Sequence, residues 1–389
     1  MSNALMIQQT QPEQGNTIIH KVQEFLDVQY KFTYNINTNR ILFKRRDTPS
    51  KFEYLTDYEF NSILKNIKKE NILCSRDTLR TILFSDFVAA FNPYLNYFNN
   101  LPKWDGKDYI SLLAESVTVT EVDFWKFCLK KWLVALVGSL IDDKVINHTA
   151  IIFSGEQGIG KTTWFRSILP LEFQEYIYEG YVPTKDKETQ IKISECALIL
   201  MDELENMSSK NVDSLKQLIT QQCIYLRRAY TTISQAYIRR ASFAGTVNHK
   251  QFLYDMTGNR RFLCFDVESF NLNHQIPHNQ LYAQLLHLFR TGFQYWFNEE
   301  EIAQVNIHNN QFRAVSAEEE VLTRYFEPCD ENDATIFLAT TEIQQLLVQK
   351  SDFSSLSVQN LGHVLRGMKF LRLKRQGAYV YALKEKHTE

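Results

Sequence analysis

The chain has 389 residues, of which 44% are hydrophobic and 23% charged, and it carries a net charge of −2. This composition excludes the fibrous and intrinsically disordered classes, and the length predicts two or three domains. Because the net charge is close to zero, nucleic acid could be bound only by a local basic cluster.

Six cysteines are too widely spaced for a zinc knuckle or a redox pair, and most lie in apolar runs. We expect buried free thiols and a reducing compartment, hence a cytoplasmic location. No signal peptide is visible at the polar N-terminus. The longest apolar stretch, 132–153, is interrupted by Asp142, Asp143 and Lys144, so we expect no membrane segment. Residues 1–16 are expected to be disordered or tag-derived.

Residues 17–100 are expected to form a small α+β domain. Phe32–Arg46 predicts a hairpin turning at 37–39, and helical patterns cover Asp57–Lys69 and Ser75–Ala90, with Asn92-Pro93 ending the segment. Residues 101–148 are expected to be a linker and helical collar. In it, Trp104 would fill a core, and a buried helix would run over Glu121–Ile141.

From residue 149 to 300, short apolar strands alternate with helices, a pattern typical of a parallel α/β sheet. The expected strands are AIIFSG, ALILMDE, IYLRRAY, AYIRRASFAGTVN and RFLCFDV, and the expected helices are Thr162–Ile168 and Ser208–Gln222, the latter capped by Ser208. In residues 316–389, helices at Ala317–Phe326, Thr341–Lys350 and Ser357–Met368 precede a hairpin at Gln376-Gly377. This order predicts a winged-helix-like domain.

The strongest motif is GEQGIGKT, which starts at Gly155 and matches G-x-x-x-x-G-K-[ST] between a strand and a helix. Gly155, Gly158 and Gly160 would let backbone N–H groups surround an anion. Lys161 would reach the terminal phosphates of ATP, Thr162 would ligate Mg²⁺, and Thr163 would complete the phosphate-binding set. The alternative is a chance match in a glycine-containing turn.

Further polar residues follow the next strands. Asp202 would bind Mg²⁺ and Glu203 would polarise the attacking water, although apolar strands often end in acids without such a role. Asn248 would act as a sensor of the terminal phosphate, or simply end its strand in a turn. Either Arg260 or Arg261 could be an arginine finger for a neighbouring subunit, or the two could form surface salt bridges.

The stretch from Lys216 to Arg240 mixes cations with tyrosines, a composition that suits single-stranded nucleic acid. Its candidate contacts are Lys216, Arg227, Arg228 and Tyr230, in a hairpin that turns near Thr231–Gln235. The alternative is a solvated charged hairpin. A second basic cluster flanks the C-terminal hairpin and consists of Lys369, Arg372, Lys374 and Arg375, where an ordinary basic hairpin is the alternative.

Together these residues resemble the virulence-associated E (VirE/VapE-like) family, which is similar to superfamily 3 helicases and poxvirus-type primase-helicases. The resemblance runs from about Ser85 to Val267 through FNPYLNYFNNLPKWDG, GEQGIGKT, LILMDELE, LKQLITQQCIYLRRAY and TGNRRF. It implies an AAA+-like P-loop NTPase core in a homo-hexameric ring that acts on DNA during replication of a mobile element or phage. It also implies ATPase roles for Lys161, Thr162, Asp202, Glu203 and Asn248, a finger at Arg260 or Arg261, and the 231–235 hairpin in the central pore.

The leading hypothesis is therefore an ATP-dependent DNA helicase or translocase. An ATP-binding switch or assembly protein that grips DNA without unwinding it remains open. A small-molecule kinase fits less well, because no lid with paired arginines is visible. The short N-terminal region shows no acidic catalytic cluster, so any priming activity would belong to a separate primase.

Overall fold

The computed structural model describes residues 17–49, 51–183, 186–204, 207, 209–228, 233–253, 259–375 and 377–386. The fold is mixed α/β with several sheets, and the chain divides into two compact units, Met1–Asn100 and Leu101–Glu389. The expectations for residues 1–16, Ser208, Tyr230, Thr231 and Gln376 lie outside the described residues. No described helix is long and apolar enough to cross a membrane.

The first unit is a four-stranded sheet with helices, and its strand order is β3-β2-β1-β4. Its elements are α1 (Ile18–Gln29), β1 (Tyr30–Asn35), β2 (Arg40–Arg45), β3 (Glu53–Tyr54), α2 (Asp57–Lys69), α3 (Arg76–Leu83), β4 (Ala90–Phe91) and α4 (Pro93–Asn99). The predicted hairpin is the antiparallel pair β1–β2.

Two expectations for this unit are wrong. The helix predicted over Ser75–Ala90 stops at Leu83, and Ala90–Phe91 instead pairs in parallel with β1. Asn92-Pro93 begins a helix and does not close the segment. The Asn92 side chain accepts hydrogen bonds from the first turn of α4, and Pro93 occupies a position where a missing N–H costs nothing.

The second unit is built on a six-stranded sheet of order β5-β12-β6-β11-β8-β7. The strands are β5 (Val117–Val119), β6 (Ala150–Ser154), β7 (Ile177–Glu179), β8 (Leu198–Met201), β11 (Ser242–Val247) and β12 (Phe262–Phe270). All neighbours pair in parallel except β5 with β12. Every residue of β6, β8 and β11 is buried, as expected for central strands covered on both faces.

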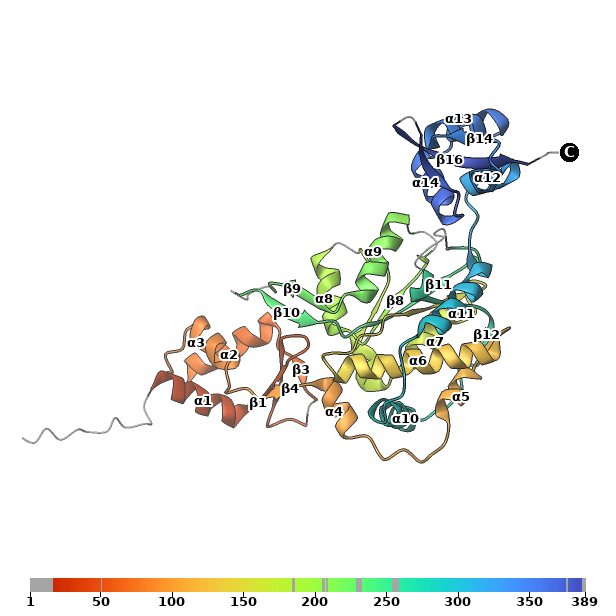
Figure 1. Ribbon diagram of the computed structural model, residues 1–389. Helices are drawn as coiled ribbons and strands as arrows, with labels where there is room; N and C mark the ends of the chain where they lie inside the picture. Colours follow the sequence, from red (N-terminus) through yellow and green to blue (C-terminus); the bar gives the residue numbers. More distant parts are fainter. Residues whose placement is uncertain are drawn as a thin grey trace, which may run out of the picture. The chain divides into compact units, whose positions relative to one another are not determined.

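Helices cover this sheet on both sides, with α8 and α9 on one side and α6 on the other (Figure 1). The helices are α5 (Tyr109–Ala114), α6 (Val122–Ile141), α7 (Lys161–Ser167), α8 (Lys187–Glu195), α9 (Ser209–Thr220), α10 (His278–Arg290) and α11 (Glu299–Asn309). Short 3₁₀ turns lie at Leu171–Tyr176, Asn259–Arg261 and Asn310–Phe312. Trp125 of α6 packs edge-on against Phe153 and Phe265, which fixes α6 against β6 and β12.

The linker predicted at the start of residues 101–148 is partly folded into regular elements. It contains α5, and β5 adds an antiparallel edge strand to the main sheet. Trp104 does not fill a core: it is only partly buried, and its Nε1 donates to the Lys107 carbonyl at 2.7 Å.

The stretch AYIRRASFAGTVN also differs from its predicted strand. It divides into β10 (Gln235–Ile238) and β11, and β10 pairs antiparallel with β9 (Cys223–Leu226) in a separate two-stranded sheet. The break falls at Arg239, which is fully buried and donates to the Gln221 and Asn147 carbonyls at 2.9 Å each.

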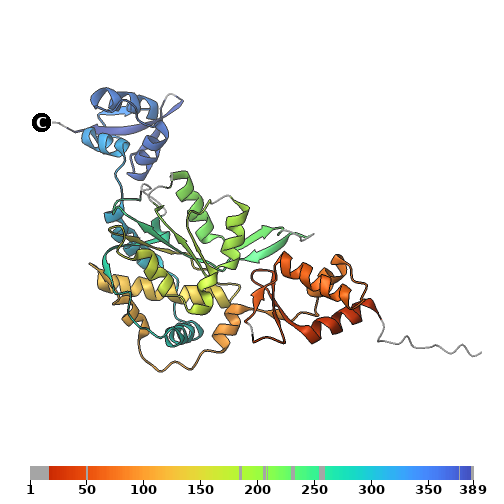
Figure 2. The ribbon, with the colours of Figure 1, turned by 180° about the vertical axis from the view of Figure 1, so that it is seen from behind.

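The C-terminal segment, blue in Figures 1 and 2, combines three helices with a small sheet. Its elements are α12 (Ala317–Tyr325), β13 (Phe326–Pro328), β14 (Ile336–Leu338), α13 (Thr340–Lys350), α14 (Val358–Gly367), β15 (Arg372–Arg375) and β16 (Ala378–Glu385). Strand β16 pairs antiparallel with β13, β14 and β15. Its core includes Val321, Ile343, Leu347, Leu361 and Leu365.

Candidate functional site

The loop between β6 and α7 has a backbone that requires glycine. Gly155, Gly158 and Gly160 have φ angles of 148°, 86° and 102°, a region that L side chains rarely adopt. At Gly155, an added Cβ would also lie 2.5 Å from the backbone oxygen of Val267. The three glycines of the motif therefore occupy the positions where the loop between β6 and α7 needs a positive φ.

Lys161 folds back over this loop. Its side chain is buried, and Nζ donates to the carbonyl oxygens of Gly155 at 2.7 Å and Glu156 at 2.8 Å. The ammonium also lies 3.4 Å from Oδ1 of Asn248, the residue that follows β11. The loop, the lysine and the predicted sensor thus meet at one edge of the sheet.

Asp202 joins the same group from β8. Its Oδ1 accepts hydrogen bonds from Thr162 Oγ1 at 3.1 Å and from Thr246 Oγ1 at 2.9 Å. Strands β6, β11 and β8 are adjacent and parallel, so their carboxyl ends lie at the same edge. This is the edge where open α/β sheets bind ligands.

Glu203 and Thr163 are exposed beside this group. Glu203 has a φ of 53°, an uncommon left-handed conformation for a residue other than glycine. Such backbone conformations cost free energy and cluster at functional sites. An exposed carboxylate thus lies immediately after Asp202.

Arg260 and Arg261 lie at the amino ends of the parallel strands, opposite the carboxyl ends where the glycine-rich loop lies. They directly precede β12, whose first residue, Phe262, pairs with Ala150 at the start of β6. The glycine-rich loop follows the far end of β6, and five strand residues span roughly 16 Å. The structure therefore does not bring the arginines to the glycine-rich loop of the same chain.

The two arginines line a cavity of about 250 Å³ together with His148, Tyr295 and Trp296. Arg260 is exposed. Arg261 is partly buried, and this burial, with the nearby charge of Arg260, lowers its pKa. Nε of Arg261 has no hydrogen-bond partner among the residues that the structure describes.

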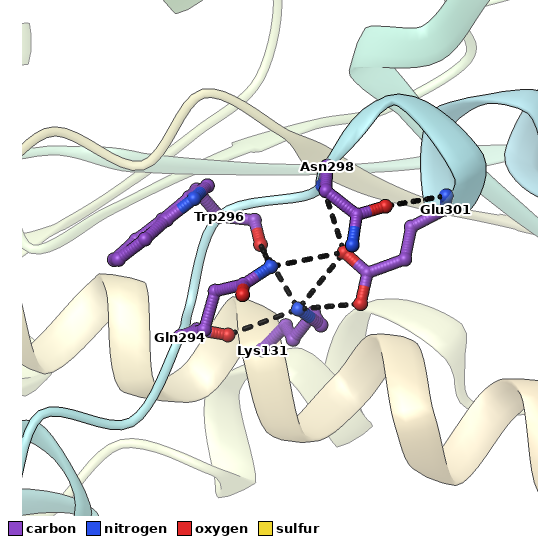
Figure 3. A network of polar contacts seen from close by, with 5 residues as sticks. All are labelled: Lys131, Gln294, Trp296, Asn298 and Glu301. Carbon is purple, nitrogen blue, oxygen red and sulfur yellow. Dashed lines mark hydrogen bonds and ion pairs between the residues drawn. The ribbon is translucent and has the colours of Figure 1, made fainter.

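A buried lysine holds the segment that carries Trp296, one of the residues that line this cavity. Figure 3 shows the polar network around it. Lys131 of α6 donates to the carbonyl oxygens of Gln294 and Trp296 at 2.9 Å each and forms an ion pair with Glu301 at 3.0 Å. Glu301 in turn closes a capping box with Asn298 at the start of α11. The connection between α10 and α11 is thereby tied to α6.

Two predicted nucleic-acid contacts are buried in the fold. Lys216 is 5% exposed and lies 3.7 Å from Asp213. Arg228 is 7% exposed, forms an ion pair with Glu195 at 2.7 Å and stacks on the Tyr237 ring. A side chain enclosed in this way is not accessible to a DNA strand, so the prediction for these two residues is corrected, while Arg227 and Tyr225 are exposed.

Several polar partners in the site were not predicted by the motifs. Thr246 binds Asp202, Ser154 Oγ donates to Asp266 at 2.7 Å, and Lys250 lies 3.3 Å from Asp266. One signal was available for Thr246, which is a polar residue in the buried strand β11. The pairing of Ser154 with Asp266 depends on β6 and β12 being neighbours, which no local pattern reveals.

The sequence profile of the virulence-associated protein E-like domain matches residues 98–314 of the chain. Among solved structures, the apo NrS-1 C-terminal region (305–718) is 12% identical with a TM-score of 0.48, and 96% of this chain aligns with all of that chain. The A form of that region is also 12% identical, with a TM-score of 0.43 and coverages of 95% and 100%. No curated protein sequence matches the chain.

Proposed function

Because the chain belongs to the virulence-associated protein E-like family, whose profile matches more than half of it, we propose that it is an ATP-driven DNA motor. In this proposal residues 149–300 form a P-loop NTPase core of the AAA+ and superfamily 3 type, and residues 316–389 form a winged-helix domain. The motor works as a helicase or translocase in replication of a mobile element or phage.

One observation carries the proposal: Lys161, Thr162, Asp202 and Asn248 meet at the carboxyl edge of the sheet beside a glycine-rich loop. The donor set fits Mg-ATP. Lys161 Nζ is held by two neutral carbonyls, which a phosphate oxygen could replace with a stronger, charge-assisted bond. The hydroxyl of Thr162 and the carboxylate of Asp202 are hard oxygen ligands of the kind Mg²⁺ prefers.

Each residue then has a separate task. Lys161 orients the terminal phosphates, while Thr162 and Asp202 hold the metal, whose charge offsets that of the phosphates. Glu203, exposed beside Asp202, orients the attacking water and accepts its proton. Asn248 reports through its contact with Lys161 whether the terminal phosphate is present.

The position of Arg260 and Arg261 supports a ring. Since they lie at the amino edge of the sheet, they can complete a phosphate site only in another subunit. Head-to-tail contacts close into a ring when the rotation between subunits is a whole fraction of a turn, and we propose a homo-hexamer. Single-stranded DNA would pass along the β9–β10 hairpin, where Arg227 and Tyr225 are exposed for phosphate contact and base stacking.

A DNA-gripping switch would use the same site without separating strands. A forked duplex with a fluorophore and a quencher on its two strands distinguishes the two functions. We expect ATP-dependent strand separation by the wild-type chain and none by Lys161→Ala. If the wild type hydrolyses ATP and binds the fork but leaves the strands paired, the switch is the correct function.

A further inference from the structure

The C-terminal segment has a strongly asymmetric charge distribution. Between Phe353 and Lys384 there is no Asp or Glu, whereas six basic residues occur: Arg366, Lys369, Arg372, Lys374, Arg375 and Lys384. Arg375 pairs with Glu331 and Lys384 pairs with Glu327, both at 2.8 Å. The other four have no ion pair with the described residues, so their charge is available to an anionic partner.

Helix α14 presents one apolar and one polar face within this segment. Leu361, Val364 and Leu365 are buried, and the helix packs against α12 and α13. Gln359, His363 and Arg366 are exposed and recur at i, i+4 and i+7, which places them on one stripe of the helix, with exposed Asn360 beside it.

The start of α14 is held in place from inside the segment. The backbone N–H of Ser357 donates to the buried carboxylate of Glu318 at 2.9 Å, and the Leu356 carbonyl accepts from Gln344 at 3.2 Å. The helix therefore keeps its polar stripe in a fixed position relative to α12 and α13.

The strands that follow add a second basic element. Arg372 and Lys374 of β15 are exposed, and Arg372 stacks on the exposed Tyr379 of β16 at 4.1 Å. Duplex DNA offers two kinds of group, base edges and phosphates. The helix supplies amide, imidazole and guanidinium groups for the first, and the neighbouring hairpin supplies cations for the second. Base edges in the major groove pair with Gln, Asn and Arg, and the phosphates attract the cations.

We propose that α14 lies in the major groove of duplex DNA and reads base edges with Gln359, Asn360, His363 and Arg366, while Arg372 and Lys374 bind the backbone. The chain would then have a sequence-specific duplex site in addition to the single-strand path of the motor. This site needs neither ATP nor the glycine-rich loop.

The test uses the full chain without ATP and a pool of duplexes that carry 20 randomised base pairs. We expect repeated selection to enrich a sequence motif. Fluorescence anisotropy then compares an enriched duplex with a scrambled one. Gln359→Ala/His363→Ala should reduce the preference for the enriched duplex by about tenfold or more while retaining non-specific affinity. Arg372→Ala/Lys374→Ala should weaken binding to both duplexes equally. It should also reduce the slope of log affinity against log salt concentration by about 2.

The matched control is Gln345→Ala/Gln349→Ala, which removes two exposed glutamines from α13 and should leave the preference unchanged. The proposal is overturned if the wild-type pool enriches no motif. It is equally overturned if the α14 variant keeps the full preference, or if single strands compete better than any duplex. ATP hydrolysis is measured on the same samples. If the chain hydrolyses ATP but enriches no motif, the duplex site has failed and the motor has not.

Discussion

Arg227 and Arg228 are adjacent in sequence but have opposite environments. Arg227 is exposed at the end of β9, whereas Arg228 is enclosed by Glu195, the Ser194 hydroxyl and the Tyr237 ring. The Glu195 side chain is only 9% exposed, so the pair is screened little by solvent. Removal of one partner leaves the other charge buried without compensation.

We therefore expect Arg228→Ala to lower the free energy of unfolding by roughly 3 kcal/mol. Urea denaturation followed by tryptophan fluorescence is a suitable measurement, because all five tryptophans lie between residues 104 and 296. The matched variant Arg227→Ala should change the unfolding midpoint little and instead weaken binding to single-stranded DNA. Equal unfolding midpoints for the two variants would contradict the buried ion pair.

At the residue scale, the phosphate-binding candidates could be predicted because each belongs to a motif whose spacing reflects its chemistry. The DNA contacts could be predicted only in part. Ile224, Leu226 and Arg228 alternate along one buried side, while Tyr225 and Arg227 are exposed on the other, and this period of two is readable in the sequence. The partner Glu195 is not readable, since it comes from α8 and is brought near by the tertiary fold.

At the scale of elements, α6 carries an ion pair that organises the connection to α11. Lys131 is 4% exposed in its side chain and Glu301 is 18% exposed. We expect Lys131→Met to lower the free energy of unfolding by roughly 3 kcal/mol, because Glu301 and two carbonyls would lose their cation. The control Lys126→Met removes a more exposed pair with Glu115 on the same helix and should cost less than about 1 kcal/mol.

The same denaturation measurement decides this prediction. If Lys131→Met is as stable as Lys126→Met, then Figure 3 depicts a network that contributes little to the fold. A large difference would instead show that the contacts of Lys131 with Gln294, Trp296 and Glu301 stabilise the fold.

The elements that the sequence predicted best are those with a continuous apolar run, such as β6, or a long helical pattern, such as α2 and α6. Those that it missed are short or depend on distant partners. Strand β5 has three residues, too few for a pattern, and becomes a strand only because β12 provides its hydrogen-bonding edge. Helix α8 has its apolar positions spread among charged residues, so its period is weak.

At the scale of the whole molecule, the two edges of the main sheet carry complementary parts of one proposed site. The glycine-rich loop, Asp202 and Asn248 lie at the carboxyl edge, and Arg260 and Arg261 lie at the amino edge. Only a second copy of the chain can bring these parts together. Two inactive variants, each damaged at a different edge, should therefore complement each other in mixed rings.

Steady-state phosphate release from ATP, measured with single-stranded DNA present, tests this account most directly. We expect turnover by the wild type and close to none by Glu203→Gln, which retains nucleotide binding, or by Arg260→Ala/Arg261→Ala. An equal mixture of the two variants should recover about a quarter of the wild-type rate, because random mixing places a subunit with an intact Glu203 next to one with intact arginines at that share of all subunit contacts. Full turnover by Glu203→Gln alone, or a mixture as inactive as its components, would contradict the account.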